Sequence, residues 1–69
     1  MIELSLNVRD INKAADKNRV GGGGGVYCSL QGSESFHRIT QAKSVRGQLV
    51  VRRLHDGHWV YPVAVYKEW

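Results

Sequence analysis

With one cysteine among its 69 residues, this chain cannot form an internal disulfide, and no spacing of Cys and His fits a closed zinc site. A hydrophobic core of this size rarely contributes more than about 3–5 kcal/mol of net stability without such a crosslink. We therefore expect one small domain over residues 1–69 that folds economically, forms a homodimer or belongs to a larger parent protein. A hydrophobic content of 42% with 23% charged residues argues against disorder.

The chain lacks the patterns that would direct it into or across a membrane. No apolar run approaches the roughly 18 residues that a spanning helix needs, and the N-terminus has no basic region followed by an apolar one. A lone Cys28 in a chain without an export signal fits a reducing compartment. We expect a cytoplasmic protein with no membrane partner and no cofactor.

The N-terminal third predicts a strand followed by a helix. Residues 2–7 alternate apolar and polar, as a half-buried strand does. Asn7 is a candidate helix N-cap with Asp10 in the capping-box position, and the helix should stop near Asn18. Its apolar stripe consists of Val8, Ile11 and Ala15, helped by Ala14.

Five consecutive glycines, residues 21–25, interrupt the chain. Glycine loses more backbone entropy on folding than other residues, so such a run does not form the interior of a helix or strand. A phosphate-binding loop would need a following Gly-Lys-Ser/Thr, whereas this run ends in Val26. We interpret residues 21–25 as a flexible connector, natural or engineered.

The central segment predicts a strand over residues 26–30 and then a helix over 34–45. Ser33 is in a position to cap that helix, and Glu34 suits the positive end of its dipole. Phe36 and Ile39 supply a narrow apolar face, and Gly47 would end the helix. The opposite face is broad, polar and basic.

Two strand-like runs, 49–54 and 58–63, flank Asp56-Gly57, which is a strong hairpin pattern. A two-residue turn places Leu54 opposite Trp59, and places Arg52 and Arg53 on opposite faces. Pro62 cannot donate to a ladder, so pairing should end there or lie at an edge. The expected fold is a small α+β domain with two short helices and a wing-like C-terminal hairpin.

The positive charge of the chain is concentrated in residues 35–55. The first 34 residues carry four bases and four acids, and the last 14 carry one base and two acids. Residues 35–55 contain no Asp or Glu and contain five bases: Arg38, Lys43, Arg46, Arg52 and Arg53. A segregated excess of this kind is the usual footprint of a surface that meets a polyanion, most often nucleic acid.

These features predict a non-catalytic domain that binds double-stranded DNA. A basic helix over 34–45 can lie in the major groove, about 12 Å wide, while the hairpin reaches the backbone or the minor groove. The candidate contacts are Arg38, Gln41 and Lys43 on the helix, and Arg46, Arg52, Arg53 and His55 around the hairpin.

Other readings of the same residues remain open. His37, His55, His58 and Cys28 include no spacing that defines a metal site or a thiol–imidazole pair, and we do not expect an enzyme. Four C-terminal aromatic residues are expected mainly in the core, although they would also suit a platform for single-stranded DNA or RNA: Trp59, Tyr61, Tyr66 and Trp69. The alternative from another class is a protein-interaction module, such as a phage inhibitor or toxin-like domain that recognises an acidic surface.

Two stretches resemble the KilA-N type of phage and viral DNA-binding domain. Asn7–Lys17 resembles its early helix, and Gly57–Trp69 is similar to its "G-x-W-V-x-P-x-x-A…W" ending. Ser33–Ile39 resembles its Ser/Thr-rich helix start. The order of helix, Gly47, hairpin and tail is also similar to winged-helix excisionases. Both resemblances imply DNA binding without catalysis, in transcription regulation or as a recombination accessory of a phage or mobile element.

Overall fold

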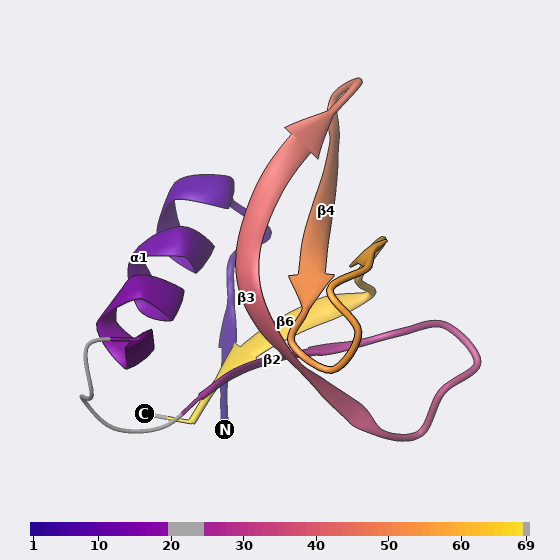
Figure 1. Ribbon diagram of the computed structural model, residues 1–69, viewed down its shortest axis with the longest axis horizontal. Helices are drawn as coiled ribbons and strands as arrows, with labels where there is room; N and C mark the ends of the chain where they lie inside the picture. The colour runs from indigo at the N-terminus through magenta and orange to yellow at the C-terminus, as the bar shows by residue number, and fades with distance from the viewer. Residues whose placement is uncertain (20–24, 69) are drawn as a thin grey trace.

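The computed structural model describes residues 1–19 and 25–68 as a small α+β domain (Figure 1). Within these residues one helix accompanies a six-stranded antiparallel sheet. The elements are β1 (Ile2–Leu4), α1 (Val8–Arg19), β2 (Val26–Ser29), β3 (Phe36–Val45), β4 (Gln48–Arg53), β5 (Trp59–Val60) and β6 (Ala64–Lys67). The α+β class expected from the sequence is confirmed, with one helix instead of two.

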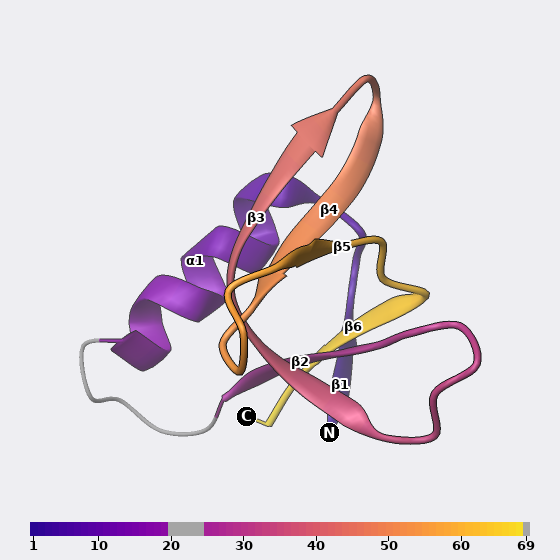
Figure 2. The same cartoon turned by 45° about the vertical axis from the view of Figure 1, so that its right-hand side comes forward.

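The strand order is β1-β6-β2-β3-β4-β5, and the long strand β3 joins two halves of the sheet. Its first residues, 36–38, pair with β2, and its later residues, from Ile39 to Val45, pair with β4. The register shifts between Ile39 and Gln41, where Thr40 is an extra residue, a β-bulge. Bulges bend a strand and increase its twist, and β3 curves from one half of the sheet into the other (Figures 1 and 2).

The core lies on one side of this bent sheet, which we call the inner face, and α1 packs against it. The apolar stripe of α1 is confirmed, with Ile11 at 0% and Ala15 at 6% exposure. The sheet contributes the other buried residues of the cluster: Val26, Cys28, Ile39, Ala42, Val51 and Val65. The opposite side, the outer face, has no helix over it in the described part of the chain.

The start of α1 agrees with its sequence. The backbone N–H of Asp10 donates to Oδ1 of Asn7 over 3.2 Å, which is the expected N-cap bond. The N–H of Asn7 donates to the carbonyl of Ser5 over 2.7 Å, so a tight turn leads from β1 into the helix. The predicted strand before it is confirmed but shorter, ending at Leu4.

The predicted helix over 34–45 is wrong, because this segment is the strand β3. The apolar pair that suggested a helix, Phe36 and Ile39, is divided between the two faces of the strand, with Phe36 52% exposed and Ile39 3% exposed in the core. The core residues Ile39 and Ala42 are also three residues apart, because Thr40 bulges between them. Three-residue spacing of buried residues is otherwise typical of a helix. Ser33 does not cap a helix but accepts a bond from the N–H of Ser35, which forms a turn before β3.

Gly47 ends no helix but completes the two-residue turn between β3 and β4. Val45 pairs with Gln48, and the residues between them, Arg46 and Gly47, have φ angles of 52° and 79°. Positive φ at both positions defines the type I′ turn, which matches the right-handed twist of a hairpin. A non-glycine residue such as Arg46 adopts this backbone region at a cost of roughly 1–2 kcal/mol.

The second hairpin exists, but its predicted register is wrong by two residues. Arg52 pairs with Trp59, and the connection is four residues, 54–57, instead of two. The cause is a helical-type turn in which the N–H of Gly57 donates to the carbonyl of Arg53 over 2.8 Å. β5 ends before Pro62, as expected from its missing N–H.

The helix α1 covers the free edge of β3. Beyond residue 38 this edge has no strand beside it in the described part of the chain, and Asn12 of α1 takes that place. Its Oδ1 accepts from the N–H of Ala42 over 2.8 Å, and its Nδ2 donates to the carbonyl of Ala42 over 2.9 Å. One side chain thus reproduces the two bonds that a neighbouring strand would make.

Most of the glycine connector, residues 21–24, lies outside the described residues. Gly25 is buried and pairs with Glu68: its N–H donates to the Glu68 carboxylate, and its carbonyl accepts from the Glu68 N–H, each over 3.0 Å. These two bonds join the start of β2 to the end of β6.

Replacing Asn12 with Ala should lower the free energy of unfolding by about 2 kcal/mol, because two partly buried backbone groups of Ala42 lose their partners. Chemical denaturation monitored by circular dichroism would measure this. Lys13→Ala, at the exposed neighbouring position, is the control and should change the value by less than about 0.5 kcal/mol. Equal effects of the two substitutions would contradict this role of Asn12.

Candidate nucleic-acid interface

Three of the predicted cations and one predicted amide lie on the outer face of the sheet. Inner-face residues of β3 and β4 alternate with exposed ones, so the exposed residues Gln41 and Lys43 lie on the side opposite Ala42. By the same alternation Arg38 precedes the inward Ile39, and Arg52 follows the inward Val51. We call Arg38, Gln41, Lys43 and Arg52 the basic face.

Arg46 lies at the tip of the β3–β4 hairpin, in the type I′ turn. This hairpin extends away from the rest of the molecule, and its tip is the part farthest from the strands β2 and β6 (Figure 1). The structure therefore adds an exposed cation at the end of a projecting ribbon whose outer side carries Lys43 and Arg52.

Arg53 is placed differently from its neighbour Arg52. It lies on the inner side, opposite Ile39, and its guanidinium forms an ion pair with Asp56. Nε of Arg52 donates to the carbonyl of Gly57 over 3.1 Å, so both arginines stabilise the 54–57 turn. His55 is exposed in the same turn.

The cations of the basic face and the tip have no acidic partner among the described residues. No carboxylate in the described part of the chain forms an ion pair with Arg38, Lys43, Arg46 or Arg52. Asp56, which balances Arg53, has a lowered pKa, chiefly because its carboxylate accepts a hydrogen bond from the backbone N–H of His58. Within the basic window 35–55, the cations that can meet a polyanion are therefore those on the outer face and at the tip.

Trp59 and Tyr61 are not core residues, contrary to expectation. Their exposed fractions are 37% and 62%, whereas Val60 between them packs against the core. Trp59 lies opposite Arg52 on the outer face, and Nζ of Lys43 is 4.1 Å from the centre of its ring. Val50 of the same face pairs with Lys43 and is only 4% exposed.

A hollow of about 470 Å³ lies beside Trp59 at the edge of the basic face. It is lined by Asn12, Asp16, Gln41, Ala42, Lys43 and Trp59. An indole ring thus adjoins amide, carboxylate and ammonium groups in one open depression. Sequence reasoning missed this site because it joins α1, β3 and β5, whose arrangement depends on the bulge and the hairpin register.

Further aromatic rings lie on the outer face of the other half of the sheet. Phe36 and Tyr66 contact each other edge to face, with ring centres 5.3 Å apart and an interplanar angle of 84°. Phe36 is 52% exposed, and Arg38 lies two residues along the same strand. Aromatic and basic side chains therefore alternate on the same side of the sheet. Trp69 lies outside the described residues.

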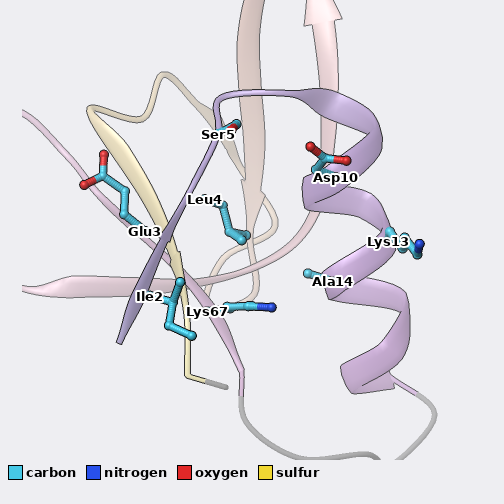
Figure 3. A pocket seen from close by; sticks show the side chains of 8 residues that line it. All are labelled: Ile2, Glu3, Leu4, Ser5, Asp10, Lys13, Ala14 and Lys67. Atoms are coloured by element: carbon cyan, nitrogen blue, oxygen red, sulfur yellow. The ribbon is translucent and has the colours of Figure 1, made fainter.

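A second hollow, of about 450 Å³, separates β1 from α1 (Figure 3). Leu4 of β1 and Lys67 of β6 extend toward the helix, which contributes Asp10, Lys13 and Ala14. None of the predicted contact residues lines this hollow.

Cys28 and His37 are cross-strand partners, but no hydrogen bond joins the two side chains among the described residues. Burial raises the pKa of the Cys28 thiol, which favours the unreactive protonated form. Nε2 of His37 is hydrogen-bonded to Oγ of Ser33 over 3.1 Å and so contributes to the turn before β3. In the described ranges no three side chains of His, Cys, Asp or Glu come together as metal ligands, and no helix is long and apolar enough to cross a membrane.

Asp56→Asn should remove the part of the protein's stability that is lost in acid through the 54–57 turn. A carboxyl group whose pKa is lower in the folded state than its ordinary value of 3.8 stabilises the fold above that value, and the contribution disappears as the pH falls through the folded pKa. The wild-type protein should therefore melt at a higher temperature than the variant at pH 7, and the difference should shrink below about pH 4. Thermal unfolding from pH 7 to pH 2.5 measures it; a difference independent of pH would exclude this effect.

No family model, curated protein or solved structure matches this chain. Of the stretches that resemble KilA-N domains, Ser33–Ile39 is a turn and the start of β3, not the start of a helix. The segment before the wing in the excisionase comparison is likewise a strand.

Proposed function

We propose that this protein is a non-catalytic nucleic-acid-binding domain whose contact surface is the basic face and the tip of the β3–β4 hairpin. The observation that carries the proposal is the set of cations on one side of the ribbon and at its tip, unpaired with any described carboxylate: Arg38, Lys43, Arg46 and Arg52. Phosphate groups are the polyanionic partner that such a surface suits best.

The mode of contact differs from the one expected from the sequence. Without a helix over 34–45, the element that approaches the nucleic acid is a two-stranded ribbon, which the major groove of duplex DNA, about 12 Å wide, can also admit. The contacts divide into ribbon residues Lys43 and Arg52, tip residue Arg46, and Arg38 at the base. Arg53 is excluded from this set because Asp56 neutralises it.

A protein-interaction module remains the second candidate, and exposed apolar side chains favour it. Outside the basic face and its tryptophan, the side chains of Leu54, Tyr61 and Val63 are 54%, 62% and 59% exposed. Such residues are common in the centre of protein interfaces when they form one patch. Binding to this surface would depend weakly on salt, in contrast to binding of phosphates.

Arg38→Ala combined with Lys43→Ala should weaken binding to nucleic acid and reduce its salt dependence. Each lost phosphate contact should flatten the slope of log K against log salt by about 0.7–0.9. The control is Arg9→Ala combined with Lys13→Ala, which removes the same charge from exposed positions of α1. Fluorescence anisotropy with labelled oligonucleotides between 25 and about 200 mM salt makes the comparison. An equal loss in both double variants would mean that only net charge matters.

Arg46→Asn should separate stability from binding. Asparagine suits the first position of a type I′ turn better than arginine does, so the free energy of unfolding should rise by up to about 1 kcal/mol. The same change removes the cation at the tip, so the affinity for nucleic acid should fall. The slope of log K against log salt should become smaller in magnitude by about 0.7–0.9. Denaturation and anisotropy on the same preparation test both effects. A more stable variant with unchanged affinity would remove Arg46 from the interface.

A further inference from the structure

The outer face carries a ring whose position is unusual for a purely structural tryptophan. Trp59 is 37% exposed in a two-residue strand at the edge of the sheet, and the ammonium group of Lys43 lies 4.1 Å from its ring centre. A cation at that distance makes a cation–π contact, so this face of the ring is covered by a side chain from the surface of the sheet. Lys43 has a flexible side chain, so it can leave the ring for a phosphate when another group takes its place.

Building on the proposed function, we propose that the nucleic acid is single-stranded and that the hollow beside Trp59 receives one of its unstacked bases. Every base has a π-face that can stack on an indole ring. The hollow of about 470 Å³ falls within the range of small-ligand sites, roughly 300–1,000 Å³. A base inside a duplex cannot reach such a depression, because both of its faces are already stacked.

Except for the carboxylate of Asp16, which also lines the hollow, the polar groups around the ring fit the other parts of a nucleotide. Gln41 lines the hollow with an exposed amide, which can both donate to and accept from a base edge. Arg52 is the cross-strand partner of Trp59, and Lys43 stays within reach of the ring after a base has displaced it, so cations flank the stacking position on two strands. These cations are in a position to contact the phosphates on either side of the inserted base.

The strand would continue along the outer face toward the other half of the sheet. Arg38 lies on this side of β3, and the exposed ring of Phe36 follows two residues away, in contact with Tyr66. Aromatic rings interleaved with cations are the usual surface for single strands, in which stacking supplies affinity without dependence on sequence. Binding of nucleic acid to a sheet face of this composition does not depend on the groove of a duplex.

The test uses the intact protein and three probes of equal length: a mixed-sequence single strand, the same strand with abasic sites in place of its bases, and the duplex. The single strand should bind on the order of 10- to 100-fold more tightly than the abasic strand, because both offer the same phosphates and only one offers stacking. It should also bind more tightly than the duplex and quench tryptophan fluorescence. Equal binding of the single and abasic strands, or a preference for the duplex, would overturn the single-strand proposal.

Failure of the underlying proposed function gives a different result. If none of the three probes binds at low salt, nucleic-acid binding itself is wrong; if all three bind equally with a steep salt dependence, nucleic-acid binding stands and only the base-stacking site is wrong. The two inferences therefore fail separately.

Variants at Trp59 assign the stacking to this ring. Trp59→Ala should remove the preference for the single strand over the abasic strand while leaving the salt slope unchanged, since the phosphate contacts remain. Trp59→Tyr keeps an aromatic ring, and should retain most of the preference while losing most of the quenching. A preference that survives in a folded Trp59→Ala variant would place the stacking elsewhere. If Trp59→Ala does not fold, the Trp59→Tyr variant decides. Quenching as strong in Trp59→Tyr as in the wild-type protein would also place the stacking elsewhere.

Discussion

The pairing of Asn12 with the backbone of Ala42 is the interaction on which the arrangement of this small domain depends. β2 is only four residues long and pairs with three residues of β3, so the remainder of β3 would be an open edge. One amide side chain makes both bonds of a missing strand and thereby fixes α1 beside the sheet. The apolar stripe of the helix then covers the inner face. With one helix in the described part of the chain, the outer face remains bare, which makes it available for contacts with a partner.

The local parts of this fold could be predicted from the sequence, whereas the parts that depend on a bulge could not. The start of α1 follows from Asn7, and its buried stripe follows from the spacing of Ile11 and Ala15, because both depend on neighbours in the chain. β3 could not be recognised in the same way. Its two buried residues, Ile39 and Ala42, are three apart only because Thr40 bulges, and nothing within the segment indicates that bulge.

The candidate site was predictable as a set of charges but not as a surface. Composition identifies residues 35–55 as the basic window, and alternation along a strand would have assigned Lys43 and Arg52 to one face if the strand had been recognised. The exposure of Trp59 could not be inferred. Tryptophan in a small chain is normally a core residue. Trp59 shares a face with Arg52 in the predicted register and in the observed one, since a shift of two residues does not change faces. What the sequence does not indicate is that α1 covers the opposite face, toward which Val60 is directed.

The structure also separates cations that the sequence presents as equivalent. Arg52 and Arg53 are adjacent, yet strand alternation places one on the outer face and the other where Asp56 neutralises it. Arg53 thus stabilises the turn and contributes little to the external field. Arg46 shows the opposite balance, since it occupies a backbone conformation that glycine or asparagine would adopt more easily, in the turn at the end of the projecting β3–β4 hairpin. Folding alone would favour glycine or asparagine at this position, whereas the proposed binding surface would require the charge that arginine provides there.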